Sequence, residues 1–111
     1  MATLTERLDA DYLAAMKARQ RLRIDTLRLV KAGIQRMAIE KRKKTLEDQE
    51  IIQVLQREAK QRRETLEAAQ KTNRQDILAQ TTEELAILNS YLPQALSQDA
   101  VNHLIEEVLY P

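Results

Sequence analysis

Cationic side chains are the groups of this 111-residue chain most able to do chemistry, and they are concentrated in one segment. Residues 17–44 contain eleven Lys or Arg residues and only two acidic ones, Asp25 and Glu40. Residues 76–111 contain six acidic residues and neither Lys nor Arg. The formal net charge of +1 hides this segregation, which favours contact between the basic half and an anionic partner.

Three arginines near the start of the basic segment, Arg19, Arg21 and Arg23, are the most informative of these cations. If a helix begins at about residue 20, its dipole makes each positive charge there unfavourable by about 0.3–1 kcal/mol at low salt. A residue choice that opposes local stability indicates a function, such as binding an anion with guanidinium and backbone N–H groups. If the first two predicted helices are instead continuous, this penalty disappears.

A second basic cluster, Arg57, Lys60, Arg62 and Arg63, lies in a later predicted helix with acidic residues between its members. Salt bridges on a solvated helix face explain most of such a cluster. Arg62 is the exception, because it occupies a position in the repeat where an apolar residue is expected. The run of cations at residues 41–44 needs no function, since cations stabilise the C-terminal end of a helix.

Other chemistry is poorly represented, and we expect no catalytic residue, no cofactor and no metal. The chain has no Cys, which excludes disulfides and thiolate metal sites. His103 is the only histidine, and with Glu107 it would form only half of a metal site, so an exposed pair is expected. The adjacent carboxylates at residues 83–84 and 106–107 point to different helix faces, which is poor geometry for acid–base catalysis.

The elements that position these side chains are predicted to be helices. One glycine, two prolines and 3% aromatic residues in a chain with 32% charged residues are typical of a helical protein. Apolar spacing predicts helices over residues 4–17, 20–43, 46–72, 75–91 and 98–110. No apolar stretch approaches the roughly 20 residues that span a bilayer, and no signal peptide is evident, so we expect a cytoplasmic protein.

Individual residues mark the expected helix boundaries. Thr3 and Glu6 have the spacing of a capping box, and Thr45 is expected to cap the third helix. Asn73 is expected to take the left-handed conformation after that helix. Gly33, the only glycine, lies on the apolar side of the second helix, where it either permits a close helix crossing or is a tolerated defect.

These elements predict an all-α fold, namely an elongated bundle of long antiparallel helices followed by the start of a small C-terminal helical domain. Pro93 ends the fourth helix, because the residue before a proline avoids the helical conformation. The last predicted helix is marginal alone in water and needs a partner for its apolar face. We therefore expect domains at residues 1–91 and 92–111, the second of them incomplete.

Two short sequences are distinctive, KQRRE at residues 60–64 and YLPQALS at residues 91–97. Four less specific stretches accompany them in order, at residues 15–19, 26–29, 54–59 and 84–88. Together they resemble the GatB/YqeY family over nearly the whole chain. The resemblance implies a standalone protein related to the helical tail domain of the B subunit of the tRNA-dependent amidotransferase, a domain that helps to hold tRNA.

The leading hypothesis is a non-catalytic accessory protein that associates with tRNA or other RNA. Neither aromatic residues nor a glycine-rich loop accompany the cations, so we expect contact with the phosphate backbone rather than with bases. The residues expected to make this contact are Lys17, Arg19, Arg21, Arg23, Arg28, Lys60, Arg62 and Arg63.

Two alternatives stay open. The chain could be a protein-interaction or homodimerising module, in which the acidic half and the apolar residues Val101, Leu104 and Val108 dock on a partner or a second copy. The resemblance also implies glutamine-dependent amide transfer, a carbon–nitrogen ligase activity. For that activity the sequence offers neither a nucleophile nor an ATP site.

Overall fold

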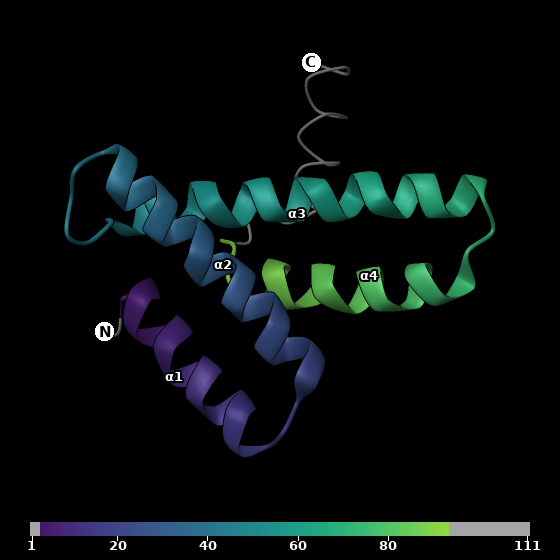
Figure 1. Ribbon diagram of the computed structural model, residues 1–111, viewed down its shortest axis with the longest axis horizontal. Helices are drawn as coiled ribbons and strands as arrows, with labels where there is room; N and C mark the ends of the chain where they lie inside the picture. Colours follow the sequence, from purple (N-terminus) through teal and green to yellow (C-terminus); the bar gives the residue numbers. More distant parts are fainter. Residues whose placement is uncertain (1–2, 94–111) are drawn as a thin grey trace, which may run out of the picture.

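The computed structural model describes residues 3–93, which form four α-helices and no strand (Figure 1). The helices are α1 (Leu4–Lys17), α2 (Arg21–Glu40), α3 (Asp48–Lys71) and α4 (Gln75–Asn89). The first four predicted helices are therefore confirmed, with ends that differ by a few residues. The predicted helix at residues 98–110, and all but two residues of the domain expected at 92–111, lie outside the described residues.

The helices are arranged as two hairpins, α1–α2 and α3–α4, and α2 lies obliquely across the second hairpin (Figure 1). α2 packs against each of the other three helices. The described part measures 41 × 38 × 27 Å, so it is broad rather than elongated. The all-α bundle is confirmed, but the expected rod of long antiparallel helices is not, because the two hairpins cross. Among residues 3–93, no helix is both long and apolar enough to pass through a membrane.

Aliphatic side chains from all four helices form one core where the hairpins cross. Leu27 and Val30 of α2 are fully buried there. Leu88 of α4 is also fully buried. Burial of each such side chain stabilises the fold by about 1.5–3 kcal/mol. The core members are Leu8, Leu27, Val30, Met37, Leu46, Ile51, Val54, Leu55, Ala59, Ile87, Leu88, Tyr91 and Leu92.

The start of α1 is fixed by the capping box that the sequence predicted. The Thr3 hydroxyl accepts the N–H of Glu6, and the Glu6 carboxylate accepts the N–H of Thr3 at 3.3 Å. The next N–H, that of Leu4, donates to Asp48 Oδ1 at 3.2 Å. The first turn of α1 is thereby attached to the first turn of α3.

The predicted cap of α3 at Thr45 is wrong. The N-cap is Glu47, which forms a capping box with Glu50 and donates its N–H to Glu50 Oε1 at 2.8 Å. The helix starts at Asp48, later than predicted, and Leu46 is buried in the core just before its first turn.

The first three helices end in the same way, with one residue in the left-handed conformation. These residues are Arg19, Arg42 and Asn73, with φ of 56°, 56° and 55°. In each case the next N–H donates to the carbonyl five residues earlier, as in a Schellman motif. These bonds are Gln20 to Ala15 at 3.0 Å, Lys43 to Ala38 at 2.9 Å and Arg74 to Ala69 at 3.0 Å. Asn73 confirms the prediction, whereas arginine at such a position was not expected.

Gly33 lies where α2 crosses α3. A β-carbon on this residue would lie 2.9 Å from Val54 Cγ1, closer than two such atoms can approach. Val54 is buried and β-branched, so its side chain has little freedom to move away. The close-crossing interpretation of Gly33 is therefore confirmed, and the distance between the two helices depends on this glycine.

Gly33→Ala should destabilise the protein even though alanine is the better helix former. We expect a loss of about 1–3 kcal/mol in the free energy of unfolding, because the added methyl overpacks the crossing. Urea unfolding of Gly33→Ala, Val54→Ala and the double variant measures this. The substitution should cost less in the Val54→Ala background, and an equal cost in both backgrounds would contradict the proposed contact.

Arg42→Gly should stabilise the protein, because glycine adopts positive φ without the steric cost of a β-carbon. The expected gain in the free energy of unfolding is about 1 kcal/mol. Thermal unfolding measures it, with Lys44→Gly in the same loop as the control for a general loss of charge. A destabilised Arg42→Gly variant would mean that the arginine side chain makes a contact worth more than its backbone strain.

Candidate functional site

The first two helices are separate, so the arginines of residues 19–23 do lie at a helix start. α1 ends at Lys17, and α2 begins at Arg21 after the left-handed Arg19. Gln20 is the N-cap residue, but its side chain makes no capping hydrogen bond, and the first turn of α2 has no acidic residue. The positive end of the α2 dipole therefore has no carboxylate in its own first turn to compensate it.

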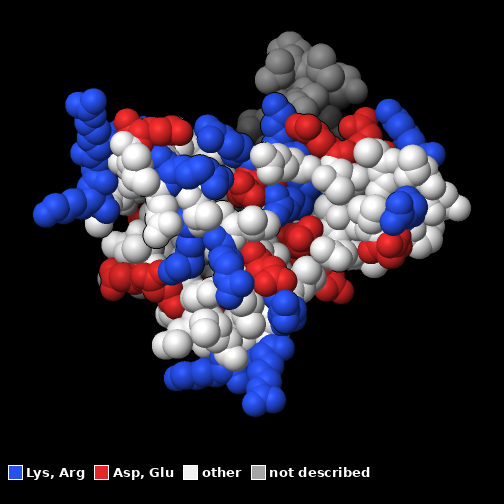
Figure 2. Space-filling model, viewed as in Figure 1, with Lys and Arg blue, Asp and Glu red and all other residues white. Residues whose placement is uncertain are grey.

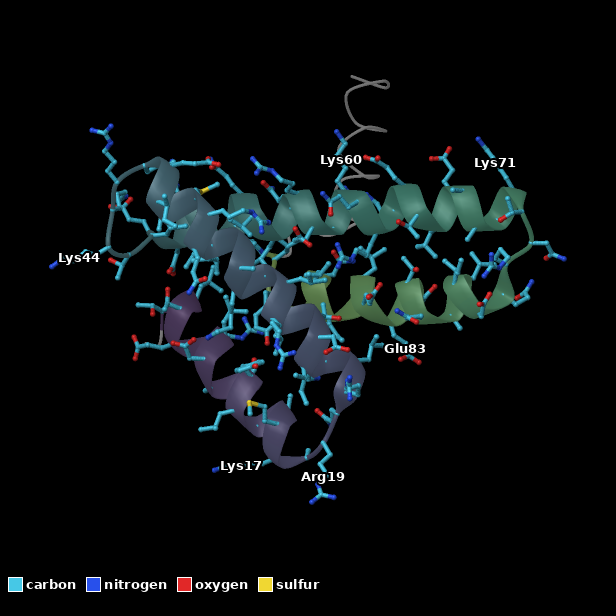
Figure 3. All side chains as sticks on the ribbon, in the orientation of Figure 1. Lys17, Arg19, Lys44, Lys60, Lys71 and Glu83 are labelled. Carbon is cyan, nitrogen blue, oxygen red and sulfur yellow. The ribbon has the colours of Figure 1, made fainter. Side chains whose placement is uncertain are left out.

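Four cations lie at this α1–α2 corner, namely Lys17, Arg19, Arg21 and Arg23. Figure 3 shows Lys17 and Arg19 extending outward from the end of the hairpin, and Figure 2 shows basic atoms at the same edge. Arg21 forms an exposed ion pair with Asp25, with Nε and Oδ2 3.5 Å apart. An exposed ion pair of this kind contributes little to the stability of the fold. Within residues 3–93 the other three cations form no ion pair.

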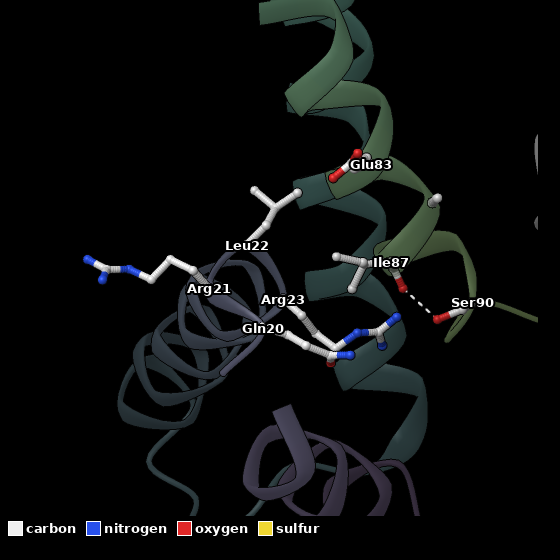
Figure 4. A pocket seen from close by; sticks show the side chains of 8 residues that line it. Gln20, Arg21, Leu22, Arg23, Glu83, Ile87 and Ser90 are labelled. Atoms are coloured by element: carbon white, nitrogen blue, oxygen red, sulfur yellow. Dashed lines mark hydrogen bonds between the residues drawn. The ribbon is translucent and has the colours of Figure 1, made fainter. Parts of the chain in front are cut away.

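Beside the corner, a cavity of about 460 Å³ opens between the first turn of α2 and the end of α4 (Figure 4). Arg23 extends across it toward Ser90, whereas Arg21 points away from α4. Glu83 lies on the α4 wall, and Leu22 and Ile87 supply apolar surface. The full lining is Gln20, Arg21, Leu22, Arg23, Glu83, Ala86, Ile87 and Ser90.

The α4 wall of the cavity is held in place by α1. The Tyr91 hydroxyl donates to Asp11 Oδ2 at 2.6 Å, and the Arg7 guanidinium lies 4.6 Å from the centre of the Tyr91 ring. Arg7 also donates to the carbonyl oxygen of Ser90 at 2.8 Å. Burial, together with the hydrogen bond to Asp11, raises the pKa of Tyr91, so this phenol stays protonated and keeps donating.

Arg28 lies on the side of α2 that faces α1. Its guanidinium donates to the Tyr12 hydroxyl, at 3.4 Å from Nε and 3.2 Å from Nη2, and this bond raises the pKa of Arg28. The Lys31 ammonium lies 5.2 Å from the centre of the same ring and pairs with Asp9. Arg28 thus helps to join the two helices, although its side chain remains exposed.

Arg62 lies inside the α3–α4 interface and not on the surface. Its Nη1 is 2.8 Å from Glu58 Oε1, its Nε is 3.8 Å from Glu84 Oε1, and its side chain is only 11% exposed. Loss of one partner from a buried ion pair costs about 3–5 kcal/mol, so this arginine has a structural role. The sequence carried the signal, since Arg62 occupies an apolar position of the repeat.

Lys60 and Arg63 are exposed on α3, away from the corner. Figure 3 shows Lys60 at the edge of the molecule opposite to Lys17 and Arg19. The eight predicted residues are therefore not brought together on one face. Four of them form the corner, Arg28 lies along α2, Lys60 lies at the opposite edge, Arg63 is exposed on α3, and Arg62 is largely enclosed between α3 and α4.

Two of the four cations after α2 form ion pairs within the fold. Lys41 and Lys43 lie 2.9 and 2.8 Å from the carboxylate oxygens of Glu50. Hydrogen bonds from Lys43, from the Glu47 backbone and from Lys41 lower the pKa of Glu50 to about 2. Glu50 thus joins the α2–α3 loop to the first turn of α3. Within residues 3–93, no group of three or more histidine or acidic side chains is placed to hold a metal ion.

The cavity residues on α4 were missed by the sequence analysis. Glu83, Ile87 and Ser90 lie more than sixty positions after Arg21 in the chain, and only the crossing of the hairpins brings them together. No local sequence pattern indicates a contact between residues so far apart in the chain.

Comparison with known proteins finds a family model that matches almost the whole chain. The model is that of the Yqey-like protein family, and the match covers residues 5–110. This match confirms the resemblance noted in the sequence. No curated protein matches the chain significantly.

The Glu50 cluster predicts a pH dependence of stability. Because the pKa of Glu50 is about 2 in the folded protein and near 4.5 as an unperturbed carboxyl, its stabilising contribution is complete above about pH 4.5 and is lost as the pH falls toward 2. Glu50→Gln should therefore lower the free energy of unfolding at pH 6, and the difference from the parent should shrink below pH 4.5. A difference that is independent of pH would contradict this assignment.

Proposed function

The chain belongs to the YqeY-like family, and from this premise and the α1–α2 corner we propose that it is a non-catalytic accessory protein that binds RNA. Family membership indicates a helical domain like the tail of the amidotransferase B subunit. The observation that carries the proposal is the corner itself, where Lys17, Arg19 and Arg23 have no acidic partner within residues 3–93.

The chemistry of the corner suits a phosphate backbone. Guanidinium groups match phosphate oxygens in charge and in geometry, and they do so better than an ammonium group does. The first N–H groups of α2 add donors and a positive partial charge to the same place. A polyanion that crosses the corner would therefore meet cations on both sides of the break between α1 and α2.

The left-handed backbone of Arg19, which Arg42 shares, costs free energy that contacts within the described residues do not offset. A left-handed arginine costs about 1–2 kcal/mol relative to the right-handed region, a cost that glycine would avoid. Within residues 3–93, Arg19 makes no ion pair that would offset this cost, and its side chain extends away from the body (Figure 3). An anionic partner would supply the missing compensation.

The proposal is confined to the corner. Lys60 lies at the edge of the molecule opposite to Lys17 and Arg19, and both Lys60 and Arg63 are exposed on α3. The α3 pair therefore serves as a control of equal charge. The protein-interaction alternative depends on the acidic half of the chain and on Val101, Leu104 and Val108, and these three residues lie outside the described part.

A tRNA-binding titration at two salt concentrations tests this proposal. Arg19→Gln/Arg23→Gln should weaken binding at least tenfold at low salt, while Lys60→Gln/Arg63→Gln, with the same loss of charge, should change it much less. The log–log salt slope should fall by about 0.7–0.9 for each phosphate contact removed, and only for the corner variant.

Three results would overturn the proposal. The first is affinity no better than micromolar at low salt, and the second is binding that does not respond to salt. The third is an equal loss of affinity in the two double variants, which would mean that the whole charge of the protein attracts RNA and that no site exists.

A further inference from the structure

The cavity beside the corner has a feature that phosphate binding alone does not explain. Glu83 lies on its α4 wall, exposed and without an ion pair among residues 3–93. A carboxylate next to a phosphate site weakens it by like-charge repulsion. The cavity is thus cationic at the Arg23 end, acidic at Glu83 and apolar at Leu22 and Ile87 (Figure 4).

We infer that this cavity holds one unstacked nucleotide of the bound RNA and that Glu83 selects guanine. The inference rests on the proposed function and deepens it by naming what the cavity binds. A volume of about 460 Å³ is within the usual range of small-ligand sites, roughly 300–1,000 Å³.

The three parts of a nucleotide match the three parts of the cavity. The phosphate belongs at the Arg23 end, next to the corner that binds the backbone. The face of the base belongs against Leu22 and Ile87, which offer apolar surface and no hydrogen-bonding side-chain group. The edge of the base then faces Glu83. A protein side chain can contact a base edge in this way only where the RNA is single-stranded.

Glu83 distinguishes the bases by the number of donors on that edge. Guanine presents two adjacent donors, N1–H and N2–H, which pair with the two oxygens of one carboxylate. Adenine and cytosine present one amino donor next to a ring-nitrogen acceptor. Uracil presents N3–H between two carbonyl oxygens, which the carboxylate repels. Among the four bases, guanine therefore gains the most binding free energy from hydrogen bonds to a fixed carboxylate.

The walls of the cavity are fixed before any ligand binds. Arg7 and Asp11 of α1 hold Tyr91 and the carbonyl of Ser90 at the end of α4. This attachment joins the end of α4 to α1, and α1 in turn packs against α2, which forms the other wall. A preorganised site loses less entropy on binding, so discrimination between bases does not require a rearrangement of the helices.

The test uses the full chain and two fluorescently labelled RNA hexamers, U6 and the same hexamer with one central guanine. Fluorescence anisotropy should show about tenfold tighter binding of the guanine-containing hexamer, since one bidentate pair is worth roughly 1–3 kcal/mol of discrimination. Glu83→Gln should abolish most of this preference. Glu67→Gln, which removes an exposed carboxylate from α3, should leave the preference unchanged.

The outcomes separate this inference from the proposed function. Equal binding of the two hexamers by the parent protein overturns the inference, as does a guanine preference that survives Glu83→Gln. A Glu83→Gln variant that binds both hexamers more tightly by the same factor would show that Glu83 only repels phosphate. If tRNA binds with the expected salt dependence but neither hexamer binds, the result supports RNA binding at the corner and contradicts a nucleotide site in the cavity.

Discussion

The close approach of α2 to α3 at Gly33 is the constraint on which the rest of the structure depends. α2 contacts all three other helices, and the absence of a β-carbon opposite Val54 sets how near α3 it can lie. The start of the same helix lies beside the end of α4, where the cavity forms. The helix that approaches α3 at Gly33 is thus the same helix whose first turn lines the cavity.

The second determinant is the way in which the chain reverses direction. Three successive helices end in left-handed residues, and two of these are arginines where glycine would cost less free energy. The first reversal, at Arg19, separates α1 from α2 and exposes the uncapped start of α2. The second, at Arg42, leads into a loop whose neighbouring lysines are paired with Glu50. The same backbone motif therefore occurs at both ends of α2. After α2 it lies beside lysines that form ion pairs with Glu50, and before α2 it lies among cations of which only Arg21 forms an ion pair.

Local properties of this chain could be read from the sequence, and long-range ones could not. Apolar spacing predicted all four helices that the structure describes, Asn73 was predicted to be left-handed, and the register of α3 indicated that Arg62 occupies a core position. The left-handed arginines were missed because nothing in their side chains favours that conformation. The crossing of the hairpins was missed because helix periodicity gives the face that packs but not the angle of packing. Glu83 was therefore not recognised as a neighbour of Arg23.

The segregation of charge along the chain does not survive folding as two oppositely charged faces. The acidic α4 lies beside α2 and α3, and acidic and basic side chains alternate over much of the visible surface (Figure 2). Glu58 and Glu84 pair with Arg62, and Glu50 pairs with Lys41 and Lys43.

The corner keeps its excess of positive charge because the helix break puts its cations at an outer edge, beyond the reach of those carboxylates. A corner with so few cations can contact only a few phosphates, and binding of that kind has moderate affinity that depends strongly on fit.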